Sequence, residues 1–467
     1  MSMIQEPAIP LYEEVVNGFN KLSSSDLGRE SSDLRRARQL AFDKFRQLGF
    51  PTIKNEDWKY TNITRFLKDE FALDGLASAT NDASATNGSN GAPATNRSDD
   101  SPAAPDQDLV KKASIDSLDC YQVVLVNGVW QGEIKGGPLP KGIELLTVAA
   151  ARQDPALSAY FEKTEWNNHP FATLNAAMFT DGLFIRVEAG ARSDKPLHVI
   201  HQFTSGYNLF VQPRHVWVIN RNGELSVIES IVSGKSGGKV WVNGLTEIIV
   251  HADARLDHTV IQAAGKGVRL LQHTTIRQKK QSLYNNYTFT LPGAELVRND
   301  LQARLEEDHT ESHLYGLYLA AGQQLIDNHT LVDHQKPFCF SNELYKGVLL
   351  EQSTGVFNGK VYVHKDAQKT NAFQQNNNLV ISKKATIDSK PELEIFADDV
   401  KCSHGSTVGQ FSEDALFYLR ARGIGEDTAK SLLINAFAFD VTEKLKIPAV
   451  EAHINELIIQ HIPVTHA

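Results

Sequence analysis

The sequence is poor in the features that mark several large classes of protein. It has three cysteines in 467 residues, Cys120, Cys339 and Cys402, which are odd in number and far apart, so a disulfide framework is not expected. No C-x-x-C pair occurs, which excludes a local zinc or iron–sulfur ligand set of the usual spacing. A metal bound by this chain would need scattered ligands or ligands from a partner.

Long apolar runs and an excess of positive charge are also absent. No stretch approaches the roughly eighteen uninterrupted apolar residues of a membrane span. Lys and Arg number 47 against 56 Asp and Glu, which gives a net charge of −9, whereas nucleic-acid binders are usually basic. The first residues carry acids and lack the pattern of a signal or transit peptide. We therefore expect a soluble cytoplasmic protein with no membrane span and no nucleic-acid partner.

Motifs for nucleotide binding and for a nucleophilic serine are missing as well. The segment Gly234-Lys235-Ser236 ends like a P-loop, but Glu229 stands where the first glycine should be. No G-x-G-x-x-G opens a helix, and no G-x-S-x-G occurs. We therefore predict that this chain binds no nucleotide.

A Gly-Ile-Gly turn at residues 423–425 resembles the turn of a helix-hairpin-helix DNA-binding motif. The acidic residues Glu426 and Asp427 that follow it have the wrong sign for contact with phosphates. We favour a tight connection between two helices, in which glycine supplies a positive φ.

Residues 11–50 predict two helices, because apolar residues recur at helical spacing on either side of a Ser- and Gly-containing break. From about residue 77 to 108 the chain consists almost wholly of small and polar residues. Such a segment cannot bury enough apolar surface to order itself, so we predict a flexible insert.

The residue pattern from 182 to 408 predicts a long series of short β-strands. Short β-branched runs, such as LFIRV at 183–187 and HVWVI at 215–219, are bounded by Gly, Asn, Asp or Ser. These strands are too many for one β-sandwich. A solenoid can hold them all, because each coil stacks on the one before it. We predict a β-helix of roughly ten coils of about 20–25 residues, with a large barrel or two sandwiches as rivals. The amide-rich run at 374–378 suits the turns of such coils.

After Gly409 the pattern changes to helix. Ser412 is a good N-cap, Gly423 a good residue to end the first helix, and further helices are predicted at about 426–446 and 450–462. The predicted organisation has five regions: an N-terminal helical region at 1–76, a flexible low-complexity insert at 77–108, a mixed α/β connecting region at 109–180, a β-helix core at 181–409 and a C-terminal helical domain at 410–467.

Twelve of the sixteen histidines fall between residues 198 and 404. His309 and His313 have the spacing of a zinc-binding helix, but the strand pattern after them argues against a helical pair. We interpret these two, together with His329 and His334, as side chains that bond within the coils or to one another.

Cys402 and His404 form the most specific candidate for a metal-binding site in the sequence. They stand two residues apart near the junction of the strand region and the C-terminal helices, so on an extended strand they project to the same face. Thiolate and imidazole both suit iron or zinc, and two ligands make an incomplete site. The alternative is a buried cysteine beside a structural histidine.

The sequence around this site resembles that of a known family. ADDVKCSHGSTVGQ at 397–410, followed by LFYLRARGI at 416–424, is similar to the C-terminal core of the SufB/SufD family of iron–sulfur cluster assembly proteins. The resemblance is dense from about residue 340 to 440. It includes GVFNGKV at 355–361 and PELEI at 391–395. NEDWKYT at 55–61 and the CSHG segment look like the SufD branch of the family.

The resemblance implies a right-handed parallel β-helix between N- and C-terminal helical parts, in a non-catalytic scaffold subunit rather than an enzyme. It implies pairing with a SufB-like subunit through the β-helix and with a SufC-like ATPase through the C-terminal helices, with a homodimer possible when SufB is absent. His404 and Cys402 would lie at the SufB interface, where they would bind the metal of a transient iron–sulfur cluster shared with SufB.

Two alternative functions stay open on the sequence alone: an enzyme and an inert structural subunit. A β-helix lyase or hydrolase would need paired carboxylates, and Asp398 and Asp399, if on a strand, would point to opposite faces. An inert structural subunit would carry no ligand at all.

Overall fold

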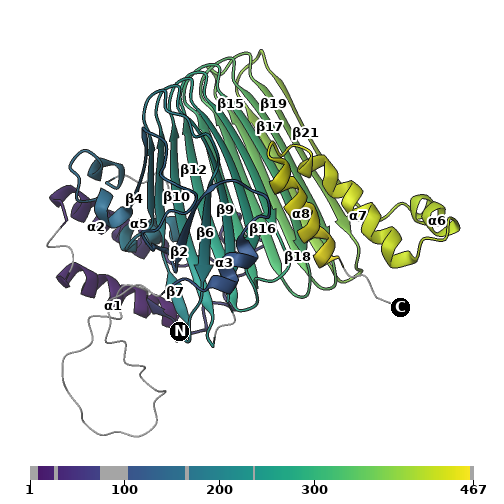
Figure 1. Cartoon of the computed structure of the whole chain (residues 1–467), viewed down its shortest axis with the longest axis horizontal. Coiled ribbons are helices and arrows are strands. Elements are labelled where there is room, and N and C mark those ends of the chain that lie inside the picture. The colour runs from purple at the N-terminus through teal and green to yellow at the C-terminus, as the bar shows by residue number, and fades with distance from the viewer. Residues whose placement is uncertain (1–8, 26–29, 74–103, 163–167, 235–236, 463–467) are drawn as a thin grey trace, which may run out of the picture.

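The computed structural model describes residues 9–25, 30–73, 104–162, 168–234 and 237–462. In this part of the chain a parallel β-solenoid of about eight turns lies between N-terminal and C-terminal helices, as Figure 1 shows. The predicted fold class is confirmed. Residues 77–103 of the predicted insert lie outside the described residues, and α3 (Gln107–Ala113) begins just before its predicted end.

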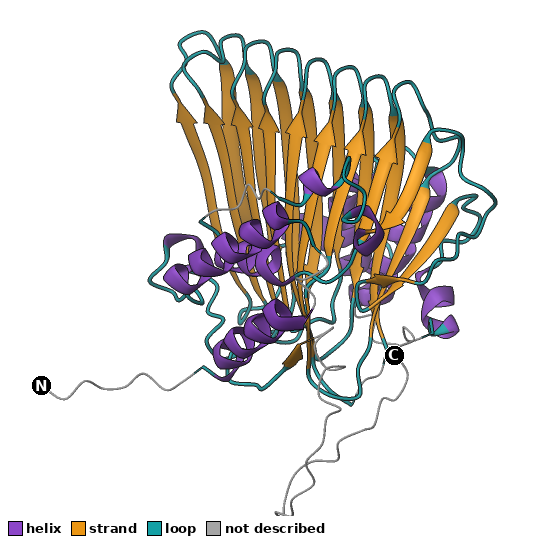
Figure 2. Cartoon of the chain, turned by 90° about the vertical axis from the view of Figure 1, so that its left-hand side faces the viewer, coloured by secondary structure: helices purple, strands orange, loops and turns teal. Residues whose placement is uncertain are grey.

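The solenoid has two sheets of stacked strands (orange in Figure 2), and successive strands of one sheet alternate along the chain with strands of the other. The first sheet contains, in spatial order, β20 (Thr386–Ile395), β18 (Thr354–Val363), β16 (Leu325–His334), β14 (Leu296–Leu305), β12 (Val268–Gln278), β10 (Val240–Val250), β8 (Arg214–Ile219), β5 (Leu183–Val187) and β4 (Ile143–Thr147). In the same sheet β7 (Leu209–Val211) pairs with β10, and β1 (Ala72–Leu73) pairs with β7. The second sheet contains β21 (Lys401–Gly409), β19 (Asn371–Val380), β17 (Phe340–Leu349), β15 (Glu311–Ala320), β13 (Leu283–Thr290), β11 (Arg255–Ala263), β9 (Glu224–Ser233), β6 (Leu197–Phe203), β2 (Tyr121–Val126) and β3 (Val129–Trp130).

The coils are longer than the sequence suggested. Register partners on successive coils are 27 to 32 residues apart, as in Arg269 with Leu296 and Thr354 with Thr386. The prediction of roughly ten coils of 20–25 residues is therefore wrong. Two strands of about ten residues and two connections fill each coil, so fewer coils fit into the same length.

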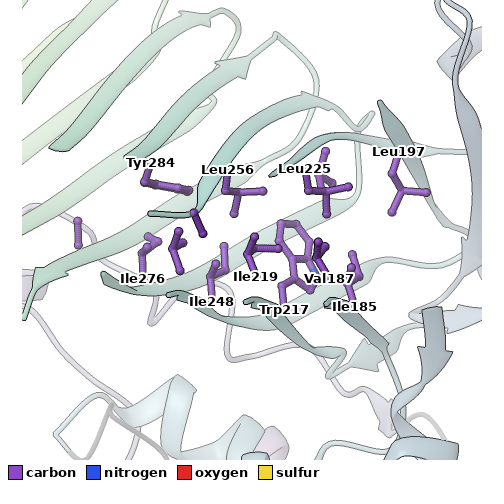
Figure 3. Packing of buried hydrophobic residues seen from close by; sticks show 14 of the residues in the cluster. Ile185, Val187, Leu197, Trp217, Ile219, Leu225, Ile248, Leu256, Ile276 and Tyr284 are labelled. Carbon is purple, nitrogen blue, oxygen red and sulfur yellow. The ribbon is translucent and has the colours of Figure 1, made fainter. Parts of the chain in front are cut away.

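The solenoid interior is filled by side chains from both sheets. Trp217, Leu225, Leu256 and Tyr284 belong to one buried cluster, and Figure 3 shows how side chains of the two layers point toward one another. This follows from the alternation of a strand, in which every second residue turns inward.

Two N-terminal helices and a connecting helix cover the outer face of the first sheet. α1 (Pro10–Ser25), α2 (Ser32–Leu48) and α5 (Pro170–Met178) share one buried cluster with outward residues such as Trp241 and Leu271. Ser31 caps α2 by accepting a hydrogen bond from the Leu34 N–H at 3.1 Å. The predicted pair of N-terminal helices is confirmed. The other short helices of the described chain are η2 (Glu56–Trp58), α4 (Val148–Ala151) and η4 (Ser158–Tyr160).

The aromatic motif at 55–61 docks this N-terminal layer onto the solenoid. Trp58 is 2% exposed, and the guanidinium of Arg298 lies 3.9 Å from its ring centroid. Arg298 also donates to the Asp57 carbonyl at 2.8 Å, and the Thr61 hydroxyl donates to Asp327 at 2.5 Å. An aromatic ring under a desolvated guanidinium is a strong anchor.

The C-terminal helices fold back over the outer face of the second sheet. α7 (Glu426–Thr442) and α8 (Pro448–His461) pack through residues such as Ile434 and Ile454, whereas α6 (Glu413–Ala421) buries none of its residues. Ser412 caps α6, and Gly423 takes a φ of +84° after it, both as predicted. α7 ends at Thr442, before the predicted residue 446. Among the helices of the described residues, none is long and apolar enough to cross a bilayer.

We predict that Trp58→Ala loosens the N-terminal layer without unfolding the solenoid. Removing a buried tryptophan costs about 3–5 kcal/mol, and the cost falls on the docked segment. Amide hydrogen exchange in α2 should therefore accelerate strongly while exchange in β12 and β14 stays slow. Tyr60→Ala is the matched control, because Tyr60 is 39% exposed and its loss should cost no more than about 0.5 kcal/mol. Unchanged exchange in α2 of the Trp58 variant would contradict the docking role.

Candidate functional site

The solenoid ends at two strands that each have a neighbour on one side only. β20 pairs with β18, and β21 pairs with β19. Within the described residues, the outer backbone edges of β20 and β21 meet no further strand, so their N–H and C=O groups are available to another chain. We call residues 386–409 the open end; it lies on the side of the solenoid away from the first strands (Figure 1).

Cys402 and His404 both lie on β21, at the open end. Cys402 is the register partner of Ala372 and His404 that of Gln374, and both of these partners are buried on the inner face of β19. The two candidate residues therefore project to the same, inner side of the last coil, as the strand pattern predicted. Because no later coil covers them, His404 is exposed and Cys402 is only half-buried.

The Cys402 thiol packs against a small apolar cluster. This cluster includes Val361, Val363 and Ala372 from the coils beneath it. Burial raises the pKa of Cys402 above that of an ordinary cysteine, although a backbone hydrogen bond at Ala372 opposes the shift. At neutral pH the side chain is therefore a thiol, and binding of a metal would have to displace its proton.

His404 lines a hollow of about 490 Å³ between the strands and α7. Tyr315, Asp440 and Glu443 line the same hollow. The imidazole itself projects to the inner side of the coil and is exposed, so it is open to solvent and to a partner chain.

A buried carboxyl group lies in the column of inward residues that leads to His404. Glu343, Gln374 and His404 are successive register partners on β17, β19 and β21. Glu343 accepts hydrogen bonds from Thr330 Oγ1 at 2.5 Å and from Gln374 Nε2 at 2.8 Å. Burial raises the pKa of Glu343 to about 7, although these two hydrogen bonds oppose the shift.

The sequence alone does not predict this column of Glu343, Gln374 and His404. The pattern that could indicate it is the amide-rich run at 374–378, which the sequence analysis expects in the turns of the coils. That prediction is wrong, because the run lies in β19. Its amides do bond along the stack, since Gln374 reaches Glu343 and Asn377 accepts from Thr407 on the next coil.

The open end also exposes large apolar side chains, since Phe396 is 56% and Val408 58% exposed. On the neighbouring strand β19, Phe373 is 37% exposed. A second apolar surface lies on the C-terminal helices, where Phe417 is 73% and Tyr418 57% exposed. Exposed aromatic and aliphatic groups gathered in this way are typical of protein interfaces.

The other candidate residues lie outside this site. His309 contacts Asp308, His313 contacts Glu311, and His329 contacts Asp327, while His334 contacts the Ser341 hydroxyl. Their interpretation as satisfied polar side chains holds for His309, His313 and His329, whereas Nδ1 of His334 is buried and meets no hydrogen-bond partner among the described residues. Asp398 and Asp399 occupy the bend between β20 and β21, so the assumption that they lie on a strand is wrong. Asp399 forms an ion pair with Lys369.

Fold and site together define a β-solenoid subunit whose last coil presents a thiol and an imidazole at an open sheet edge. Two family models match the chain. The SufBD core domain of the SUF system for iron–sulfur cluster assembly covers residues 202–437, and the SufBD N-terminal region covers residues 14–84. The chain belongs to the SufBD family of iron–sulfur cluster assembly proteins.

Relatives of the whole chain agree with this assignment. An iron–sulfur cluster assembly SufBD family protein of Synechocystis is 30% identical over 442 residues, which cover 92% of each chain. The iron–sulfur cluster assembly protein SufD of Escherichia coli is 28% identical over 89% of this chain and 90% of its own. A SufBD family protein of Mycobacterium leprae is 36% identical over 47% of this chain and 58% of its own.

We predict that Cys402 in the isolated chain reacts more slowly with iodoacetamide at neutral pH than an unhindered thiol does. Its raised pKa leaves little thiolate, and the rate should rise as the pH approaches 9 and beyond. Mass spectrometry of the labelled peptides measures this rate. Cys339, which is 1% exposed, serves as the unreactive control in the folded chain. Rapid labelling of Cys402 at pH 7 would show that its thiol is activated rather than protonated.

We predict that Glu343 makes the chain less stable as the pH rises from about 4.3 to 7. Its pKa is about 7 in the folded chain and near 4.3 in the unfolded chain, so the folded chain holds the extra proton in this window. The stability is fully present below about pH 4.3 and is lost at up to roughly 1.4 kcal/mol per pH unit as the pH rises toward 7.

Urea unfolding midpoints at several pH values measure this effect. Glu343→Gln keeps the shape of the side chain and should flatten the pH dependence relative to the unaltered chain. Glu14→Gln, at an exposed helix position, is the matched control and should leave the dependence unchanged. Parallel pH profiles for the unaltered chain and the Glu343 variant would contradict the prediction.

Proposed function

We propose that this chain is a SufD-like, non-catalytic subunit of a SufB–SufC–SufD scaffold on which iron–sulfur clusters are assembled. The observation that carries the proposal is the open end, where β21 presents Cys402 and His404 beside an unpaired strand edge. A SufB-like subunit would add to this edge by strand pairing, which supplies main-chain hydrogen bonds along the whole strand. The exposed Phe396 and Val408 would be buried in the same contact.

His404 and Cys402 would then supply part of a ligand set that the partner completes. The nascent cluster is cargo, so its ligands must release it, and a site divided between two chains can open when the chains move apart. An imidazole and a thiolate are suitable ligands for iron. Proton loss from Cys402 would accompany iron binding, because its raised pKa keeps the free thiol protonated.

The C-terminal helices would bind the SufC-like ATPase. α6 has no buried residue in the described structure, and Phe417 and Tyr418 expose most of their surface. An amphipathic helix of this kind fits a hydrophobic groove on a partner. In this proposal ATP is bound by that partner and not by the chain itself.

The open end would also permit a homodimer when SufB is absent, since a second copy offers the same unpaired edge. We place the assembly in the cytoplasm, because the three cysteines are free thiols and thiols persist in reducing compartments. No nucleic-acid or membrane partner is proposed, and the net charge of −9 is consistent with the first of these.

The test is co-purification with SufB-like and SufC-like partners, followed by anaerobic reconstitution. We expect a stable complex whose iron and sulfide content falls by roughly tenfold or more in His404→Ala, because a ligand is lost while the interface remains. His309→Asn is the matched control: His309 is an exposed histidine with a φ of +60°, which Asn tolerates, and its loss should not change the cluster content.

Two results would contradict the proposal. An intact complex with unchanged cluster content in His404→Ala would leave the chain as an inert structural subunit. Failure to form any complex with the two partners would remove the scaffold role itself.

A further inference from the structure

Three polar side chains converge on the outer face of the first sheet, where the connecting region meets the solenoid. His169 is the N-cap residue of α5, His273 lies on β12 and Asp300 lies on β14. His273 and Asp300 are register partners on neighbouring coils, and the rings of His169 and His273 lie 4.3 Å apart. One ligand atom from each of the three residues lies within 4.8 Å of the others.

The separations between the two imidazole nitrogens and the Asp300 carboxylate suit ligands of one metal ion. His169 Nε2 lies 3.4 Å from Asp300 Oδ2, and His273 Nδ1 lies 3.3 Å from the same oxygen. Charge-assisted N–H···O bonds are shorter, at about 2.7–2.9 Å. A tetrahedron around an ion with bonds of about 2.0–2.1 Å has edges of roughly 3.3–3.4 Å, which match the two observed separations.

Imidazole binds a metal ion in its neutral form and carboxylate in its ionised form, so binding here would displace any proton that the three side chains carry at their ligand atoms.

Arg298 fixes the carboxylate of Asp300 from behind. Its Nε and a second nitrogen donate to the two Asp300 oxygens at 2.9 and 2.8 Å, and it also pairs with Asp327 at 2.6 Å. Asp300, Asp327 and Arg298 together carry one net negative charge. The positive charge of Arg298 therefore does not make the site repel a cation. Such a partner orients a carboxylate that binds a metal.

The site can be reached from solvent. His169 and Asp300 line a hollow of about 400 Å³, and Glu56, Asp57 and His329 line it with them. Glu56 and Glu394 are paired with Lys390 and Lys360, which line the same hollow, so the entrance carries charges of both signs. His273 is 0% exposed and would complete the ligand set from beneath.

We propose that His169, His273 and Asp300 form a binding site for one divalent transition-metal ion of the Zn²⁺ class, with a water molecule in the fourth position. Two imidazoles and a carboxylate are a common ligand set for such an ion. Binding through Nε2 of His169 moves the ring proton to Nδ1 and ends the 3.4 Å hydrogen bond that Nδ1 accepts from the Ala172 N–H. That bond is long, so little is lost. The ion would tie the start of α5 to two coils of the solenoid.

The test uses the full chain with Cys402→Ser and His404→Ala already in place, so that the open end contributes no ligand. We expect this chain to bind one equivalent of Zn²⁺ by calorimetry and metal analysis. His169→Gln should weaken binding at least about tenfold. His329→Gln is the matched control: His329 lines the same hollow but contacts Asp327, and Zn²⁺ binding should survive its replacement.

A spectroscopic measurement leaves all three ligands unaltered. Co²⁺ added to the same chain should give the intense visible bands of a four-coordinate ion with nitrogen and oxygen ligands. The proposal is overturned if the chain binds no Zn²⁺, if His169→Gln binds it as well as before, if His329→Gln loses it equally, or if Co²⁺ gives only the weak bands of a six-coordinate ion. Because the open-end residues are absent from this experiment, its outcome is independent of the proposed function.

Discussion

The register of the stacked coils is the constraint on which the rest of the structure depends. Each strand finds its hydrogen-bond partners in the coil before it and the coil after it, so the ladder is complete only while another coil follows. The chain ends the stack at Gly409, where it leaves the second sheet for α6. β20 and β21 are therefore left with open edges, and the residues that would have been core in a longer solenoid become surface. The candidate site arises from this interruption.

The same register explains why the interior can hold polar groups. Side chains at equivalent positions of successive coils lie one strand spacing apart, so an amide or carboxyl group meets a possible partner above and below it. Glu343 is paired with its register partner Gln374 in this way. Glu229 bonds diagonally instead, to His201 and His258, which are the register partners of Ile231 and Val227. Burial of such groups is costly unless they are bonded, and the repeat supplies the bonds. At the open end this column of side chains stops at His404, which no later coil of the described chain covers.

Local signals in the sequence were sufficient for much of the fold and for the two candidate residues. Ser412 and Gly423 act through their own side chain or backbone angle, and the placement of Cys402 and His404 on one face needs only the alternation of a strand. The coil length could not be predicted, because it depends on which residues pair across the stack. The cluster of His169, His273 and Asp300 was missed for the same reason: its members are brought together by register and by the docking of α5, and no local spacing marks them.

The two edge strands of the open end are not equivalent as sites for a partner strand. β20 carries Pro391 near its middle, and proline has no N–H to donate and is tolerated in sheets chiefly on edge strands. β21 contains no proline, so none of the N–H groups that point away from β19 is missing. Strand addition is therefore easier along β21 than along β20, and a partner strand added there would place its own side chains beside Cys402 and His404. The backbone edge and the two candidate ligands thus lie on the same strand, so one contact with a partner could both join the chains and complete the site.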